Sequence, residues 1–298
     1  MIHHFHLDKV LFRKIASDRE RYMAYSKTQA MERMKMGSDT DHHDFFYYLL
    51  KAKDPESGAG FAIPELWGES NLLIIAGSDT TSTSLSAAFF YLVHNPDTLE
   101  RVTQEIRATF GTVEDIHSGQ QLSTCNYLRA VLDEAMRLSP PVGGLLPREV
   151  LPGGITIDGE HFPAGLVVGT PHYTIHHNAK YYPDPFAFLP ERWIPGSTPN
   201  VTPTTVATAR GAFCPFSIGP RGCIGKGMAY AELSITLARV LWTYDMRLSP
   251  DVRVGEGHPE AEFGRQRVGE FQLRDTFTSI NDGPVVEFRR RPDENKEN

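Results

Sequence analysis

The sequence predicts a mainly α-helical protein with a minor β region, folded as one domain over residues 1–298. Apolar residues recur at helical intervals in several long segments, which is the pattern of amphipathic or buried helices. Between Gly144 and Pro171 the pattern changes to Val, Ile and Thr separated by Gly and Pro, which indicates short strands. The hydrophobic share of 40 % is large enough to bury a core for a domain of this size.

Composition and charge exclude several classes of protein. The formal net charge is −7, with acidic and basic residues interspersed, so we expect no nucleic-acid partner. The 3 cysteines are an odd number and do not form the dense framework of a small secreted domain, and the chain does not open like a signal peptide, so we expect an intracellular protein. No apolar run approaches the roughly 20 residues of a spanning helix, so we expect no transmembrane segment in this chain.

Two helices are expected near the start of the chain. The first runs from Leu7 to about Met36 as a surface amphipathic helix and stops at Gly37. The second lies in DHHDFFYYLLKAK, where Asp41 is placed to cap it.

A long, buried helix is predicted over residues 64–94. Its segment begins with Pro64 near the first turn, ends before Asn95 and is apolar around most of its circumference. The stretch AGSDTTS interrupts this apolar surface, and burying Asp79 and Thr80 there without partners is costly. Hydroxyls that bond back to preceding carbonyls could open the helix into a notch for water or a ligand. The alternative is a polar patch that faces solvent.

Two shorter helices follow, over 96–110 and 126–138. The first stops at Gly111 and the second is ended by Pro140. Glu134 and Arg137 are three residues apart and share a face of the second helix. On a surface such a pair stabilises by only about 0.2–0.5 kcal/mol, so alone it is weak support for a function.

The segments after the second of these helices are less regular. Residues 144–171 suggest a small curled sheet. Residues 183–212 are rich in Pro, Thr and Ala, lack periodicity and are expected to form a long, irregular meander.

A glycine-rich loop with a cysteine precedes the last predicted helix, so that loop and helix together cover residues 216–243. The loop matches the pattern F-x-x-G-x-R-x-C-x-G through Phe216, Gly219, Arg221, Cys223 and Gly225. A thiol at a helix N-terminus has a lowered pKa and receives hydrogen bonds from backbone N–H groups. We therefore expect a stable thiolate at Cys223 that ligates a metal or acts as a nucleophile.

Other functional roles for the cysteines and histidines have less support in the sequence. Cys125 and Cys214 are expected to be buried apolar thiols. A nucleophilic role for Cys223 requires a base beside it, and no signature of a cysteine protease is present. The paired histidines lack cysteines or carboxylates at set spacing and do not predict a zinc site; they are His3, His4, His6, His42, His43, His176 and His177.

Together these motifs resemble the cytochrome P450 family, the haem-thiolate monooxygenases, in the expected order along most of the chain. AGSDTT looks like the family's oxygen-activation segment, with Asp79 and Thr80 in the acid and alcohol positions. Glu134 and Arg137 match its E-x-x-R pair, and Arg192 in PERW matches the arginine that completes the triad.

The resemblance also assigns residues to the cofactor. Arg221 and Arg148 fall where the family binds haem propionates, and a guanidinium suits a carboxylate. Phe216 and Gly225 are the remaining cofactor contacts in the loop. His176 stands where relatives often have histidine, and we expect a structural role for it.

The family's chemistry follows as an expectation. The cofactor would be haem b, with Cys223 as the axial ligand whose electron donation favours O–O cleavage. Thr80, with Asp79, would organise water and relay protons. One oxygen atom from dioxygen would enter a hydrophobic small molecule, and the motifs look most like fungal members of secondary metabolism. Because no flavin or nicotinamide fingerprint is present, electrons would come from NADPH through a separate flavoprotein reductase.

The chain is shorter than members of this family. We therefore expect an N-terminally truncated cytochrome P450 fold without the anchor that holds full-length relatives at the endoplasmic reticulum membrane. The alternative function is a truncated, non-catalytic relative or fragment that binds haem weakly or not at all, or serves as a partner. The uncovered face of the long helix would then be a hydrophobic patch prone to association.

Overall fold

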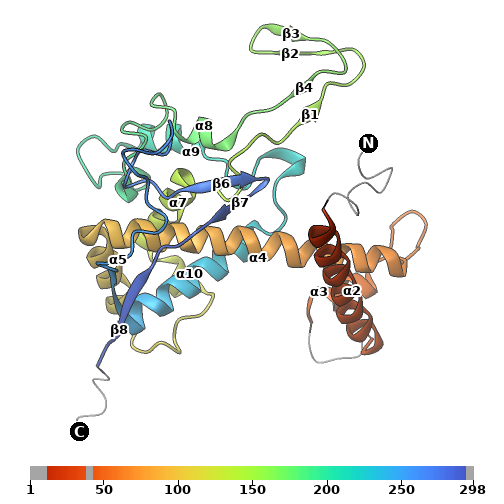
Figure 1. The fold of residues 1–298 in the computed structure, drawn as a ribbon, viewed down its shortest axis with the longest axis horizontal. Helices are drawn as coiled ribbons and strands as arrows, with labels where there is room; N and C mark the ends of the chain where they lie inside the picture. The colour runs from red at the N-terminus through yellow and green to blue at the C-terminus, as the bar shows by residue number, and fades with distance from the viewer. Residues whose placement is uncertain (1–11, 38–42, 293–298) are drawn as a thin grey trace. The chain divides into compact units, whose positions relative to one another are not determined.

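The computed structural model describes residues 12–37 and 43–292, and helices predominate in it (Figure 1). This agrees with the predicted fold class, mainly α with a minor β region. By its internal contacts the chain divides into two compact units, Met1–Ser78 and Asp79–Asn298. The boundary falls inside one long helix, so the single domain expected over residues 1–298 stays a prediction.

The first unit contains α2 (Arg13–Lys35), α3 (Phe45–Lys51) and the first half of α4 (Ile63–His94). Gly37, with a φ of +67°, follows the end of α2. The expected start of this helix at Leu7 lies outside the described residues, as does Asp41. The cap of α3 is Asp44, whose carboxylate accepts a hydrogen bond from the Tyr47 backbone N–H at 2.9 Å, because Asp44 directly precedes the first turn.

Helix α4 is only partly buried, which corrects the prediction of a buried helix over its whole length. Between Ile63 and Ser78 the buried residues are Leu66 and Ser70, whereas Leu72 is 58 % exposed. Ile74 and Ile75 are exposed as well. The first half of the helix therefore keeps an exposed apolar surface. The second half enters the core of the second unit.

The polar middle of α4 does not break the helix. The hydroxyls of Ser82 and Ser84 donate to the carbonyls of Asp79 and Thr80, at 3.0 and 2.9 Å. These bonds are of the expected backward kind, and the α-helix still runs unbroken from Ile63 to His94. The expected opening of the helix is therefore absent from this described segment.

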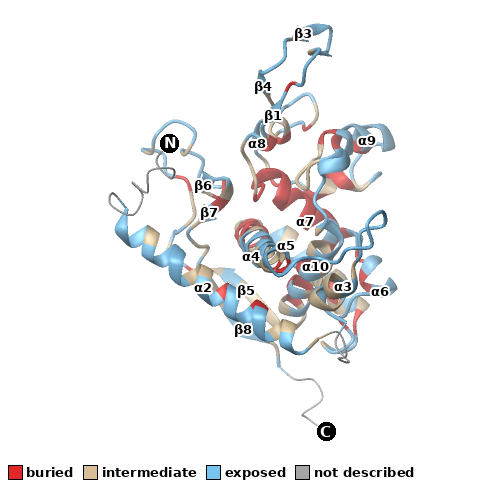
Figure 2. Ribbon diagram, turned by 90° about the vertical axis from the view of Figure 1, so that its right-hand side faces the viewer, coloured by how far each residue is buried: buried red, intermediate tan, exposed pale blue. Residues whose placement is uncertain are grey.

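The core of the second unit lies between four helices: the second half of α4, α5 (Pro96–Thr109), α7 (Asn126–Leu138) and α10 (Lys226–Thr243). Figure 2 shows buried residues gathered on the sides of these helices that face one another. The short helix α6 (Gln120–Ser123) joins α5 to α7. The most deeply buried side chains of this core are at most 1 % exposed and include Phe90, Leu92, Ile106, Leu128, Leu132, Leu237 and Leu241.

The strands form separate antiparallel pairs rather than the single curled sheet expected over residues 144–171. β1 (Arg148–Glu149) pairs with β4 (Val167–Val168), and β2 (Ile155–Ile157) pairs with β3 (Glu160–Phe162). Figure 1 shows the β2–β3 hairpin projecting away from the helices. Asp158 and Gly159, with φ of +50° and +84°, make the two-residue turn that closes it.

Two further strand pairs near the C-terminus were not expected from the sequence. β5 (Tyr244–Leu248) pairs with β8 (Val286–Arg290), and β6 (Leu273–Thr276) pairs with β7 (Thr278–Asn281). β5 follows α10 without a loop.

The stretch expected to be an irregular meander contains regular structure. α8 (His172–His176) precedes it, and η1 (Pro190–Trp193) and α9 (Pro203–Ala212) lie within it. α9 begins with a capping box in which Thr202 and Thr205 exchange side-chain to backbone hydrogen bonds. Pro203 in the first turn completes this start signal, so the Pro and Thr residues begin a helix rather than break one.

A search of the described residues finds no helix with the length and hydropathy needed to cross a bilayer.

Candidate functional site

The Cys loop, which we define as residues 214–225, joins α9 to α10 and folds on its own backbone hydrogen bonds. The Ser217 N–H donates to the Cys214 carbonyl at 2.9 Å, and the Cys223 N–H donates to the Phe216 carbonyl at 2.8 Å. Gly219, with a φ of +72°, begins the short helix η2 (Gly219–Arg221). Only glycine adopts this backbone conformation without steric cost. Ser217 also has a positive φ, +57°, and sequence reasoning did not single it out.

The loop presents the Cys223 thiol at the start of α10. Cys223 is exposed, and Gly225 is the N-cap of the helix. The first N–H groups of a helix have no partners within it, so this end carries a partial positive charge. A Cβ at Gly225 would lie 3.7 Å from the Cys223 sulfur, an ordinary contact distance. The thiol is therefore open to a ligand.

Apolar side chains lie beside the thiol in the sequence and are exposed. Ile224 is 99 % exposed and Ile218 is 78 % exposed. Exposed apolar side chains on the same loop as an open thiol can offer contact to a flat apolar group.

Phe216 links the loop to α10 and α7. Its ring centroid lies 5.1 Å from that of Tyr230, and the Tyr230 hydroxyl donates to Asp133 of α7 at 2.7 Å. Asp133 is buried, and burial raises its carboxyl pKa although the neighbouring Arg129 guanidinium lowers it. The Phe216 ring packs on Tyr230 and leaves Cys223 exposed.

Glu134, Arg137 and Arg192, which the sequence placed in one triad, lie in contact in the core. Arg137 donates to both carboxylate oxygens of Glu134 at 2.9 Å, and Arg192 donates to one of them at 2.9 Å. Glu134 and Arg137 are fully buried. Burial alone would raise the pKa of Glu134, but Arg137 and Arg192 outweigh it and hold that pKa below its ordinary value.

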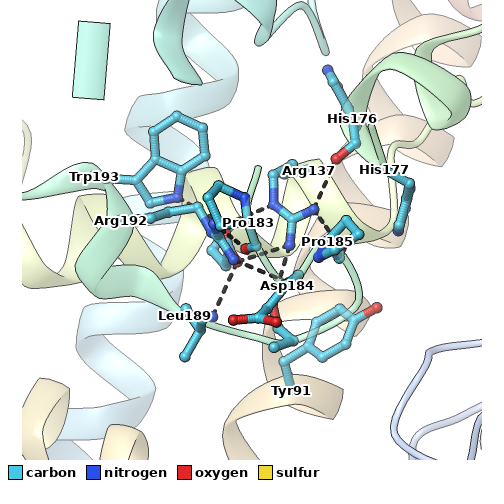
Figure 3. A network of polar contacts seen from close by, with 12 residues as sticks. Tyr91, Arg137, His176, His177, Pro183, Asp184, Pro185, Leu189, Arg192 and Trp193 are labelled. Carbon is cyan, nitrogen blue, oxygen red and sulfur yellow. Dashed lines mark hydrogen bonds and ion pairs between the residues drawn. The ribbon is translucent and has the colours of Figure 1, made fainter. Parts of the chain in front are cut away.

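Further donors complete the network (Figure 3). The Trp193 indole N–H and the Leu189 backbone N–H donate to Glu134 at 2.9 and 3.0 Å. Arg137 also donates to the carbonyls of His176, Pro185 and Ala187 at 2.8, 2.7 and 3.1 Å, so all its N–H groups are used. The sequence did not indicate Trp193 or these carbonyls, because backbone acceptors leave no trace in residue type.

His176 joins this network to the Cys loop. Its imidazole is fully buried, and its Nε2 accepts a hydrogen bond from the Cys214 backbone N–H at 3.0 Å. Burial lowers the pKa of His176 to about 3, so the ring is neutral near pH 7.

The other two cysteines are unreactive thiols by their surroundings. Cys125 is buried, and Cys214 is half-buried. Burial raises the pKa of both thiols. The expected burial holds for Cys125, whereas the Cys214 Sγ lies 3.7 Å from the His176 Nε2.

The remaining predicted site residues lie on separate elements. Asp79 is exposed and Thr80 half-buried on α4, so the expected burial of Asp79 is not observed. Arg148 donates to the Pro147 carbonyl at 2.9 Å, and Arg221 is exposed in η2. In the described part of the chain neither guanidinium pairs with a carboxylate.

No group of three His, Cys, Asp or Glu side chains is arranged for a metal ion among the residues that were placed. His3, His4, His6 and His42 lie outside the described residues.

A cavity of about 620 Å³ lies beside the loop that follows α7. Its lining includes Gly143, Gly144, Leu145, Tyr173 and Asp275.

Comparison with known structures defines the class of protein. The structure matches a crystal structure of a cytochrome P450 (CYP102L1) with a TM-score of 0.72 and 22 % identity, over 93 % of this chain and 57 % of that one. It matches the retinoic acid-bound cyanobacterial CYP120A1 with a TM-score of 0.72 and 28 % identity, over 94 % of this chain and 58 % of that one. The fold is that of the cytochromes P450.

Sequence comparison then gives the family. The family model described as Cytochrome P450 matches residues 3–267. This chain belongs to the cytochrome P450 family, whose members hold a haem iron, and the expectation from its motifs is confirmed.

Among curated relatives, the cytochrome P450 monooxygenase apf7 of Gibberella fujikuroi is 46 % identical over 95 % of this chain and 54 % of its own length. The cytochrome P450 monooxygenase AKT7 of Alternaria alternata is 42 % identical, over 95 % of this chain and 55 % of its own. A second Gibberella fujikuroi protein, the cytochrome P450 monooxygenase apf8, is 40 % identical over 96 % of this chain and 76 % of its own. The chain thus spans about half the length of the first two.

Proposed function

We propose that this protein is a haem-thiolate monooxygenase in which Cys223 is the axial ligand of the haem iron. Membership of the cytochrome P450 family supports the proposal, and so do relatives named as cytochrome P450 monooxygenases. The observation that carries it is the exposed Cys223 thiol at the N-terminal end of α10, on a loop held by its own backbone hydrogen bonds.

The residues present fit a haem. A thiolate is a strong ligand for haem iron, and the exposed Ile218 and Ile224 offer apolar contact to a flat ring. Arg148 and Arg221, which have no carboxylate partner in the described residues, would bind the propionates. Phe216 and Gly225 would be the remaining contacts, and Glu134, Arg137 and Arg192 would hold the framework around them.

When bound, the haem supplies the redox chemistry that activates dioxygen. The residues of this chain would control protons: the Thr80 hydroxyl would hold a water, and the Asp79 carboxyl would exchange a proton with it. Half-burial of Thr80 and exposure of Asp79 allow exchange with solvent. The outcome would be one oxygen atom inserted into a hydrophobic small molecule, and motif resemblance suggests a role in fungal secondary metabolism.

The electrons would come from NADPH through a separate flavoprotein reductase, because the sequence shows no flavin or nicotinamide fingerprint. A full-length relative would work at the endoplasmic reticulum membrane.

The test is the carbon monoxide difference spectrum of the reduced 298-residue chain with haem supplied. A red-shifted Soret band, the signature of thiolate ligation, is expected. Cys223→Ala should abolish this band because it removes the sulfur. Cys125→Ala, the matched control, removes a buried thiol of the helical core and should leave the band in place. A band that persists in Cys223→Ala contradicts the assignment.

A further inference from the structure

A continuous series of hydrogen bonds runs from the buried Glu134 and Arg137 pair to the Cys loop, and His176 is its middle member. Arg137 donates to the His176 carbonyl at 2.8 Å, which fixes the backbone of this residue at the end of α8. The His176 ring is held between neighbours, with its centroid 5.4 Å from that of Phe213 and 6.4 Å from that of Tyr182. Both the backbone and the ring of His176 are therefore held by residues outside the Cys loop.

The chemical form of His176 follows from its partner. A backbone N–H can only donate, so Nε2 must accept from Cys214 and must carry no proton. The neutral ring then carries its proton on Nδ1, which is buried and has no hydrogen-bond partner among the described residues. A leucine or methionine would fill the same space without burying an unpaired donor. The acceptor at Nε2 is the feature that only a polar side chain provides.

The bond to Cys214 reaches the ligand position through the loop backbone. The Cys214 carbonyl accepts from Ser217, and the Phe216 carbonyl accepts from Cys223. Within the described part of the chain, His176 is the only residue of another element whose side chain hydrogen-bonds to the Cys loop: its Nε2 lies 3.0 Å from the Cys214 backbone nitrogen and 3.7 Å from the Cys214 Sγ. The first residue of the loop is thus fixed by one imidazole nitrogen, and the position of Cys223 depends on that first residue.

We propose that His176 is a positioning residue for Cys223: its Nε2 holds the Cys214 N–H and so sets the conformation of the Cys loop from which the thiol is presented. As far as it concerns haem ligation, this inference rests on the proposed function. As far as it concerns the loop, it holds for the chain without haem.

The test compares two substitutions at one position. His176→Gln keeps an acceptor that reaches as far as Nε2, and His176→Leu fills the space without one. His177→Leu is the matched control: it removes the neighbouring imidazole, which contacts Tyr173 and Phe186 but not the loop. The first readout is amide hydrogen exchange over residues 213–226 in the haem-free chain, and the second is the reduced carbon monoxide spectrum after haem is supplied.

We expect exchange in the loop to rise about tenfold in His176→Leu, because one buried hydrogen bond is lost, and to stay near the wild-type rate in the other two variants. With haem, His176→Leu should lose most of the thiolate band and His176→Gln should retain it. Equal exchange and equal bands in His176→Leu and the wild type would overturn the inference. So would a folded His176→Gln whose loop exchanges as fast as that of His176→Leu.

The outcomes separate this inference from the proposed function. If the wild-type chain shows no thiolate band, the proposed function fails while the exchange data still decide the role of His176. If His176→Leu does not fold, His176→Asn replaces it: its shorter amide falls short of the Nε2 position, so its loop must exchange faster than that of His176→Gln.

Discussion

At the scale of single residues, the notable arrangement is a carboxylate enclosed by donors. Glu134 is fully buried and accepts from Arg137, Arg192 and Trp193. Removing water from a carboxylate costs several kcal/mol, which its partners must offset. The E-x-x-R spacing in the sequence identifies two of these side chains, and the family resemblance adds Arg192. The fourth, Trp193, becomes visible only when η1 places it against α7.

Neutralising Glu134 should destabilise the whole protein. In Glu134→Gln two buried guanidiniums lose their counter-charge, and we expect a loss of about 3–5 kcal/mol in the free energy of unfolding. Urea denaturation at neutral pH measures it. The control is Glu287→Gln, which removes the exposed pair with Arg247 and should cost less than about 1 kcal/mol. Similar losses in the two variants would show that the buried network is not what stabilises the core.

At the scale of elements, α9 shows how a short start signal outweighs composition. Pro, Thr and Ala from Thr202 onward predict a loop when they are counted, but they form a capped helix when their order is considered. The carbonyl of Ala209 in this helix accepts from the buried Tyr182 hydroxyl, so α9 also holds the chain directly before the meander.

Removing the cap should therefore be measurable. Thr202→Ala takes away the hydroxyl that accepts from the Thr205 N–H at 3.2 Å, and we expect a cost of about 0.5–2 kcal/mol in thermal or urea unfolding. The control is Thr204→Ala, in the same first turn of α9. Thr204 is exposed and its side chain does not cap the helix, so this substitution should change the stability little. The prediction is wrong if the two alanine variants are equally stable.

Elements with strong local signals could be predicted from the sequence, and those that depend on distant partners could not. The spacing of apolar residues places α5, α7 and α10 close to where the structure has them. The strand pairs β5–β8 and β6–β7 could not be predicted in this way. β5 pairs with a strand about forty positions further along the chain, and β6 pairs with β7 through a tight turn at Phe277. Exposure of the first half of α4 escapes it too, since an apolar helix does not show which of its faces another element covers.

The candidate site follows the same division. The Cys loop is contiguous, so its pattern of glycines and cysteine can be read directly. The role of His176 depends on α8 meeting the loop from 38 positions away, and only the fold brings the two together.

At the scale of the whole molecule, buried histidines make the stability depend on pH. Burial lowers the pKa of His176 to about 3 and of His177 to about 4, and it also lowers that of His172. The unfolded chain protonates these rings below about pH 6.5, whereas the folded chain resists protonation. Between these values the unfolded state binds more protons, so stability falls as the pH falls from 6.5 toward 3.

For His176 alone this amounts to about 1–2 kcal/mol between pH 7 and pH 5. The measurement is the difference in urea unfolding free energy between the two pH values, in the wild type and in His176→Gln. The variant should lose less stability on acidification by that amount, while His172 and His177 remain in both proteins. An unchanged difference would mean that His176 titrates alike in both states.

All N–H groups of Arg137 donate hydrogen bonds, and this limits how the fold can vary. Its five N–H groups end on a side chain of α7 and on main-chain carbonyls of residues 176, 185 and 187. One rigid, planar guanidinium thus fixes the relative positions of three stretches of chain. The segments between these residues can lengthen or change composition, provided that each acceptor carbonyl still lies within hydrogen-bonding distance of the guanidinium. Lysine has three donors and no fixed plane, so it cannot replace Arg137 even though it keeps the charge.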